Sequence, residues 1–230
     1  MDAGVVVAGR FELERIAGAG GMGTVWRARD RVTGRAVAVK LAPASSRDLA
    51  ERFEREAEVL CQLDHPALVG YVAHGTLGAE LFLAMEWLEG EDLSQRLERQ
   101  PLTAAESLAL ALRLADALGH AHGRGVVHRD VKPSNVLLVG GAVGAATLLD
   151  FGIARGSGLG RRVVTRAGCL VGTPGYMAPE QARGDWRSTP AADVLVPRRP
   201  AAVCRRAPGR SPGARAVRAA SAVEGAAGRP

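Results

Sequence analysis

The sequence predicts an α+β fold in which a small, strand-rich N-terminal part precedes a helical part. Short stretches that alternate apolar and polar residues, as antiparallel strands do, occur within residues 11–88. Apolar residues at helical spacing occur within residues 46–63 and 103–122. Neither period continues after residue 194, so we expect the folded part of the chain to end there.

The first pair of predicted strands flanks a run of glycines. Residues 11–16 alternate, and residues 24–28 alternate again after the glycine-rich run 18–23. Glycines let backbone N–H groups approach phosphate oxygens without a Cβ in the way. A dinucleotide-binding turn, the main alternative, needs a helix after its last glycine, whereas a strand follows here. The pattern therefore predicts a glycine-rich hairpin folded over a nucleotide.

A third predicted strand, residues 35–41, carries a lysine. Strand period places Val37 and Val39 on one face of the sheet. Ala38 and Lys40 then lie on the other face, and a small residue beside a lysine suits an adenine ring and its phosphates. The alternative is a solvated lysine on an edge strand.

Residues 46–63 read as a helix with an apolar stripe that includes Phe53 and Ala57. Glu56 lies next to this stripe, and a carboxylate held against an apolar surface needs a partner. Lys40 is the expected partner.

We expect the remaining strands of the small sheet at residues 68–69 and 81–84, and a hinge at residues 85–88. Beyond the hinge, Asp92 is a plausible cap of a short helix. Thr103 and Glu106 have the spacing of a capping box and open a long helix.

Residues 126–152 hold the polar side chains best suited to chemistry. The carboxylates of Asp130 and Asp150 follow apolar runs, with Lys132 and Asn135 close to the first. One carboxylate can accept a hydroxyl proton, the second carboxylate and the amide oxygen can hold Mg²⁺, and the lysine can neutralise a phosphoryl group. The alternative is a buried ion-pair cluster that only holds loops together.

The pattern H-R-D-x-K-x-x-N at 128–135, followed by D-F-G at 150–152, resembles the eukaryotic-like protein kinases of bacterial type. The segment K-P-S-N resembles their serine/threonine-directed branch. The resemblance covers residues 11–193 and implies a bilobal protein-kinase-like fold. Residues 1–88 are then the N-lobe and hinge, and residues 89–194 a partial, incomplete helical C-lobe.

By this resemblance the chain transfers the γ-phosphoryl group of ATP to Ser or Thr hydroxyls of proteins, with Mg²⁺. Asp130 accepts the hydroxyl proton, Lys132 stabilises the moving phosphoryl group, and Asn135 and Asp150 hold Mg²⁺. Lys40 and Glu56 complete the catalytic set. The residues implied for the nucleotide are Gly18, Gly20, Gly21, Gly23, Val25, Ala38, Lys40, Met85, Glu86, Leu88 and Leu137.

Residues 153–179 correspond to the activation loop of this family. Thr165 is the best candidate phosphosite, and Thr173 is implied to contact Asp130. Arg129 precedes the catalytic aspartate, and in this family such an arginine often binds a phosphate on the loop, which makes control by phosphorylation plausible.

Residues 195–230 differ in composition from the rest of the chain: ten Ala, eight Arg, five Pro and four Gly among 36 residues. Too little apolar surface is present to offset the ordering entropy, so we expect a disordered basic tail. A basic arm for acidic partners is one interpretation. Residues 1–194, however, carry 22 basic against 23 acidic side chains, so nucleic acid is not expected as a partner.

The kinase pattern stops abruptly after residue 194, which favours a truncated gene or a shifted reading frame over a genuine basic arm. A second hypothesis of function follows, namely an inactive kinase-like module that at most binds nucleotide or a protein partner. The three cysteines form no disulfide framework or metal-ligand spacing, which fits a cytoplasmic protein. No apolar run reaches about 18 residues, so no membrane span is expected.

Overall fold

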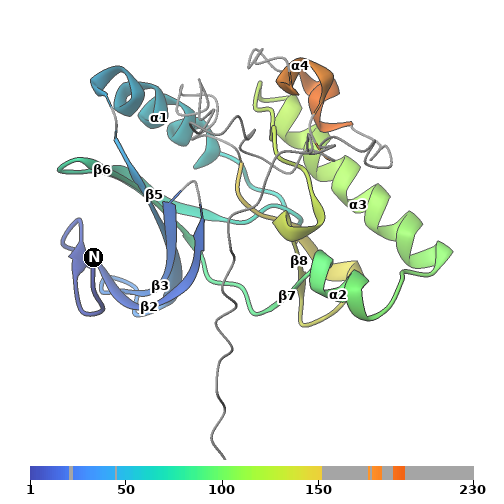
Figure 1. The fold of residues 1–230 in the computed structure, drawn as a ribbon, viewed down its shortest axis with the longest axis horizontal. Coiled ribbons are helices and arrows are strands. Elements are labelled where there is room, and N and C mark those ends of the chain that lie inside the picture. The colour runs from blue at the N-terminus through green and yellow to red at the C-terminus, as the bar shows by residue number, and fades with distance from the viewer. Residues whose placement is uncertain (21–22, 45, 152–175, 177, 183–188, 195–230) are drawn as a thin grey trace, which may run out of the picture. The chain divides into compact units, whose positions relative to one another are not determined.

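A computed structural model of the chain describes residues 1–20, 23–44, 46–151, 176, 178–182 and 189–194. All of these fall within one unit, Met1–Arg199. Within it, strands dominate the first part and helices the second, in agreement with the sequence (Figure 1). The predicted tail, residues 195–230, lies outside the described residues.

Six antiparallel strands form the first sheet, in the order β1-β2-β3-β4-β6-β5. The strands are β1 (Val6–Val7), β2 (Phe11–Gly20), β3 (Gly23–Asp30), β4 (Ala36–Pro43), β5 (Tyr71–Leu77) and β6 (Glu80–Glu86). Strands β2 and β3 form a hairpin in which Gly20 lies opposite Gly23, so the predicted glycine-rich hairpin is confirmed. Gly23 has φ +117°, and a Cβ there would lie 1.9 Å from the carbonyl oxygen of Leu41. Only glycine fits where the hairpin meets β4.

Successive residues of β4 face opposite sides of the sheet, as the two-residue period of a strand requires. Val37 and Val39 are buried in an apolar cluster with Phe11 and Trp26. Ala38 belongs to a different cluster, on the side of α1 (Arg47–Leu60). Helix α1 packs on β5 and β6, as Figure 1 also shows.

Helix α1 begins where a local cap satisfies its first N–H groups. The Ser46 side chain accepts a hydrogen bond of 3.2 Å from the Leu49 N–H. The predicted stripe, with Phe53 and Ala57, is buried. The helix ends at Leu60, three residues before the predicted end.

The expected strand at residues 68–69 is wrong. Leu68 and Val69 are buried in a loop, where Leu68 makes a single parallel bridge to Leu148. The strand at this edge of the sheet is β5, which sequence analysis missed because glycine and histidine interrupt its alternation. Gly75 is needed there, because a Cβ would lie 2.8 Å from the Phe82 ring on β6.

Among its described residues, the second part contains three α-helices and a small sheet, β7-β8-β9. Its elements are β7 (Gly90–Asp92), α2 (Leu93–Arg99), α3 (Ala104–His122), the 3₁₀ turn η1 (Pro133–Asn135), β8 (Val136–Val139), η2 (Val143–Ala145), β9 (Ala146–Leu148), α4 (Pro179–Ala182) and η5 (Pro190–Asp193). The predicted caps are confirmed: Asp92 accepts from the Gln95 N–H, and Thr103 and Glu106 form a capping box.

Helix α3 buries one face, with Leu110, Ala117 and Leu118, whereas Leu108 and Leu112 on its other face are exposed. Within the described part of the chain, no helix combines the length and the apolar character needed to cross a bilayer.

The two parts of the unit are joined at the loop after α1. The Leu148 N–H donates to the Ala67 carbonyl at 2.8 Å, and the Val69 N–H donates to the Leu148 carbonyl at 3.1 Å. Arg113 of α3 donates to the carbonyls of Pro66 at 2.7 Å and Ala146 at 2.6 Å. This loop therefore spans the junction between the sheet and α3.

A partly buried ion pair between Asp30 of β3 and Arg10 ties β3 to the turn before β2. Both carboxylate oxygens of Asp30 accept from the Arg10 guanidinium at 2.8 Å, and the Val32 N–H and Thr33 hydroxyl donate to the same carboxylate. The hydrogen bonds from Arg10 hold the pKa of the Asp30 carboxyl well below its usual range, against the opposing effect of burial.

We predict that Asp30→Asn lowers the free energy of unfolding by about 3 kcal/mol, since it leaves the Arg10 charge without its partner. The matched control is Glu12→Gln, which removes the exposed ion pair with Arg31 and costs under about 1 kcal/mol. Urea unfolding followed by circular dichroism measures both. Equal losses in the two variants would contradict this account.

Candidate active site

The loop between α3 and β8 carries the predicted catalytic residues, and one carboxylate holds its backbone. Asp193 of η5 is buried and accepts from the backbone N–H groups of His128 and Arg129, both at 2.7 Å. The same carboxylate accepts from His122 Nε2 at 2.8 Å. Gln181 of α4 donates to the Arg129 carbonyl at 2.9 Å. Arg129 is thus fixed from two sides in a left-handed conformation, φ +67°, that is unfavourable for a non-glycine residue.

His128 is buried beneath this loop, and its contacts define its protonation. Nε2 lies 2.7 Å from the Leu149 carbonyl, which can only accept, so this nitrogen carries the proton. Nδ1 accepts from the Asp130 N–H at 3.2 Å, so it carries none. Burial lowers the pKa of the imidazole below its ordinary value, which agrees with a neutral ring.

Phe151 packs its ring against His128, with ring centroids 4.7 Å apart, and against Tyr71 of β5. Its N–H also lies 3.5 Å from the Tyr71 hydroxyl. These contacts place Asp150, the residue before Phe151, beside the catalytic loop.

Asp130, Lys132 and Asn135, which lie close together in the sequence, form one hydrogen-bonded group. Lys132 Nζ lies 2.9 Å from Asp130 Oδ2. Asn135 Nδ2 donates to the same oxygen at 3.0 Å and to the Asp130 carbonyl at 2.8 Å. The turn η1 brings the amide back to the aspartate. Lys132 and Asn135 therefore orient the Asp130 carboxylate. The Lys132 ammonium can also offset negative charge on a group that binds beside it.

Lys40 extends from β4 to Asp150, with 3.0 Å between Nζ and Oδ2. Asp150 itself has a left-handed backbone, φ +47°. The first sheet and the catalytic part of the chain are thus linked by an ion pair at the site.

The expected pairing of Lys40 with Glu56 is wrong in this structure. Glu56 of α1 pairs with Arg129 instead, with 3.6 Å between Oε2 and the guanidinium. Burial raises the pKa of the Glu56 carboxyl, while the Arg129 charge and hydrogen bond oppose that effect. The physical reason is competition, because Asp150 takes the Lys40 ammonium and leaves Glu56 to the next cation within reach.

The residues expected to contact a nucleotide lie on neighbouring elements of the first sheet and on β8. Val25 of β3 lies opposite Lys40, and Ala38 lies opposite Met85. Gly18 and Gly20 have no atoms within 4 Å of where a Cβ would be, so their backbone is open to approach. Glu86 and Leu88 lie at and just beyond the end of β6, and Leu137 lies on β8.

Some expected residues lie outside the described part of the chain, namely Gly21, Thr165 and Thr173.

Other residues that shape the site were not expected. Asp193, His122 and Gln181 come from segments that follow or precede the catalytic loop, and neither periodicity nor spacing indicates that they meet it. For Asp193, the signal in the sequence is its place near the end of the kinase pattern.

The side chains present fit a divalent cation of the hard class. Asn135 uses its amide nitrogen for Asp130, which leaves its carbonyl oxygen for a ligand. Asp150 uses Oδ2 for Lys40, which leaves Oδ1. Carboxylate and amide oxygens are what Mg²⁺ prefers in proteins. A carboxylate, a cation beside it and two further oxygen atoms are the groups that a phosphate-transfer site needs.

Comparison with known proteins agrees with this class. The protein kinase domain family matches residues 11–195, so the chain belongs to that family. The kinase domain of PknI from Mycobacterium tuberculosis has the same bilobal fold, with a TM-score of 0.66 and 31% identity over 84% of this chain and 70% of that one.

Two curated relatives are bacterial serine/threonine-protein kinases. The chain is 41% identical over 185 residues to pkn2 of Myxococcus xanthus, covering 78% of this chain and 22% of that protein. It is 42% identical over 189 residues to PknJ of Mycobacterium tuberculosis, covering 80% of this chain and 32% of that protein. The chain therefore spans less than a third of the length of these two relatives.

We predict that the folded protein loses stability as the pH falls below about 6.5, the ordinary pKa of histidine. The folded state lowers the pKa of His128, so the unfolded chain binds more protons below that value. The stabilisation that comes from burying a neutral His128 is complete above the histidine pKa of the unfolded chain. It is lost as the pH falls toward the lower pKa that His128 has in the folded protein.

Melting temperatures between pH 7.5 and 5.0 measure this effect in the native chain and in His128→Gln, which can still donate to the Leu149 carbonyl. The native chain should lose more stability on acidification than His128→Gln. His74→Gln, on β5, controls for the loss of an imidazole elsewhere. An identical pH slope in the native chain and in His128→Gln would contradict the prediction.

Proposed function

We propose that the chain is a serine/threonine protein kinase that transfers the γ-phosphoryl group of ATP to hydroxyl groups of proteins. The observation that carries this proposal is the Asp130 carboxylate, held by Lys132 and Asn135 beside Asp150. Membership of the protein kinase domain family supports it.

Asp130 acts as the base. One oxygen of its carboxylate accepts the proton of the Ser or Thr hydroxyl while the hydroxyl oxygen forms a bond to the γ-phosphorus. The bond between that phosphorus and the bridging oxygen breaks, and ADP leaves with the electron pair. Lys132, whose ammonium lies 2.9 Å from Asp130, offsets the negative charge that spreads over the phosphoryl oxygens.

Asn135 and Asp150 would hold Mg²⁺, which when bound neutralises the phosphate oxygens. Lys40 approaches the phosphates from β4, and the glycine hairpin supplies backbone N–H groups above them. Ala38, Val25, Met85 and Leu137 supply apolar contact for the adenine ring, and the backbone at Glu86 and Leu88 supplies its hydrogen bonds. Glu56 and Lys40 belong to the catalytic set by resemblance, and phosphorylation at Thr165 is the proposed control of activity.

A second candidate is a module that binds nucleotide without transferring phosphate. The observation that favours it is the arrangement of charges in the structure, in which Lys40 pairs with Asp150 and Glu56 with Arg129. In this arrangement two members of the catalytic set are engaged with other partners. The three cysteines form no disulfide framework, which favours a cytoplasmic location for the protein under either function.

We predict that Asp130→Asn abolishes phosphate transfer and leaves nucleotide binding intact. The amide cannot accept the hydroxyl proton, whereas it can still accept from Lys132 and Asn135. The experiment measures incorporation of labelled γ-phosphate into the chain itself and into a generic basic protein. Loss of transfer in Asp130→Asn should be at least about a hundredfold.

The rise in melting temperature on adding Mg·ATP is measured in the same samples. An unchanged rise together with lost transfer supports the kinase. A rise without any transfer by the native chain supports the binding module instead. Transfer that persists in Asp130→Asn would contradict the role given to Asp130.

A further inference from the structure

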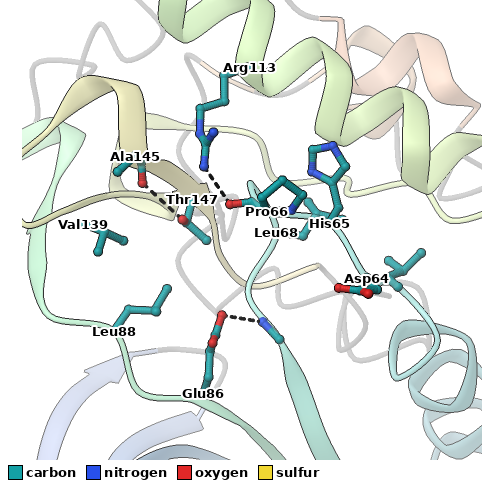
Figure 2. Close-up of a pocket in the computed structure, with 12 residues that line it drawn as sticks. Asp64, His65, Pro66, Leu68, Glu86, Leu88, Arg113, Val139, Ala145 and Thr147 are labelled. Atoms are coloured by element: carbon teal, nitrogen blue, oxygen red, sulfur yellow. Dashed lines mark hydrogen bonds between the residues drawn. The ribbon is translucent and has the colours of Figure 1, made fainter.

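Trp87 lies in the middle of the hinge, and none of the proposed catalytic steps uses its side chain. Its neighbours Glu86 and Leu88 line a pocket behind the hinge, as Figure 2 shows, and Trp87 does not contribute to that pocket. The Trp87 ring instead contacts two guanidinium groups of the glycine hairpin. The central carbon of the Arg15 guanidinium lies 5.5 Å from the ring centroid, and that of Arg27 lies 5.6 Å from it.

These two arginines lie directly opposite each other in the hairpin, Arg15 on β2 and Arg27 on β3. Like charges at opposed positions of neighbouring strands repel each other and destabilise the pairing. The face of an aromatic ring attracts a guanidinium within about 6 Å of its centroid, and tryptophan does so more strongly than the other aromatic residues. The Trp87 ring therefore compensates a repulsion within the hairpin, although it comes from a separate part of the chain.

Acidic side chains offset only part of the positive charge at this position. Glu14 pairs with the guanidinium of Arg27 and, at 3.6 Å, with that of Arg29. Within the described part of the chain Arg15 has no ion pair, so its charge is offset by the Trp87 ring. The three arginines thus have one carboxylate partner among them.

The orientation of the indole is fixed by a hydrogen bond at its edge. Trp87 Nε1 donates to Glu89 Oε1 at 2.6 Å, which also places a second carboxylate at the hinge. The partly buried ring packs against the apolar cluster that contains Met85 and Leu93. The ring is thus held by the hinge itself, and its face remains for the two arginines.

The contact lies on the face of the hairpin that is proposed to bind nucleotide. Side chains two residues apart on a strand point to the same face, so Arg27 shares a face of β3 with Val25. The register agrees, since Val25 lies opposite Lys40. Arg27 lies opposite Ala38 in the same register. The contact with Trp87 therefore joins this face to the hinge, next to the residues proposed for the adenine ring.

We propose that Trp87 is a positioning residue. Through Arg15 and Arg27 its ring clamps the glycine hairpin to the hinge, and this clamp sets the affinity for nucleotide. A hairpin that is already in place does not have to be ordered when the nucleotide binds. Without the clamp, the hairpin is in the binding position in only a fraction of the molecules, and the apparent affinity falls by that fraction. The effect on nucleotide rests on the proposed function, whereas the clamp itself does not.

Hydrogen exchange of the nucleotide-free full chain tests the clamp. Trp87→Leu keeps an apolar side chain but removes the aromatic face, so the amides of β2 and β3 should exchange about threefold faster or more. Trp87→Phe keeps a ring and should restore most of the protection. The matched control is Arg29→Leu, which removes the same charge as Arg27→Leu two residues further along β3 and should leave exchange in the hairpin unchanged.

Isothermal titration calorimetry with Mg·ATP and with adenosine tests the consequence. Trp87→Leu should weaken both ligands about fivefold, because the clamp lies at the adenine end of the hairpin. Arg15→Leu removes one of the two contacts and should weaken them about twofold. Because Arg15 acts through the ring, combining the two changes should weaken binding no further than Trp87→Leu alone. Melting temperatures without nucleotide verify that each variant is folded.

Unchanged hydrogen exchange in Trp87→Leu, or a double variant whose loss of affinity is the product of the two single losses, would overturn the clamp. Faster exchange with unchanged nucleotide affinity would overturn its role in binding. A native chain that binds neither Mg·ATP nor adenosine would refute the proposed function. Faster exchange in Trp87→Leu would then still support the clamp, and unchanged exchange would refute it as well.

Discussion

The hydrogen bonds accepted by Asp193 constrain the backbone of the loop that carries Asp130. A single buried carboxylate gathers two consecutive backbone N–H groups, of His128 and Arg129, and the imidazole of His122. Together with the bond from Gln181 to the Arg129 carbonyl, these bonds offset the conformational cost of a left-handed Arg129, about 1–3 kcal/mol. Since Asp130 follows directly, the direction of its carboxylate is inherited from this conformation.

The second level of organisation is electrostatic. Lys40 on the first sheet and Glu56 on α1 each pair with a residue of the catalytic part, Asp150 and Arg129 respectively. The first part of the chain and the candidate site are thus joined by two ion pairs of opposite polarity, and a change in one alters the partners available to the other. The buried Nε of Arg129 has no hydrogen-bond partner in the described part of the chain, so this pairing is incompletely satisfied.

Local signals in the sequence were sufficient for most of the fold. Strand period placed Val37 and Ala38 on opposite faces of β4, and the caps at Asp92 and Thr103 located the starts of α2 and α3. The strand β5 could not be found in this way, because Gly75 is there to accommodate a ring from β6, which is a tertiary requirement.

The site was predictable in its composition and less so in its contacts. The sequence placed Lys132 and Asn135 close to Asp130, and the turn η1 that joins them into one hydrogen-bonded group is seen only in the structure. The partner of Lys40 was not predictable, since two carboxylates compete for it and the outcome depends on where α1 lies. Asp193 is 63 residues from Asp130 in the chain, and only the folded arrangement reveals its contact with the loop.

The most direct test is to measure phosphate transfer by Asp193→Asn. The aspartate accepts from His122 and from the N–H groups of His128 and Arg129 with two anionic oxygens, whereas the amide has a single neutral oxygen. The account predicts that transfer falls about a hundredfold or more through misplacement of Asp130, while the rise in melting temperature with Mg·ATP persists. Asp116→Asn, which alters an exposed acid on α3, serves as the control. Full transfer activity in a folded Asp193→Asn protein would show that the catalytic loop does not depend on this carboxylate.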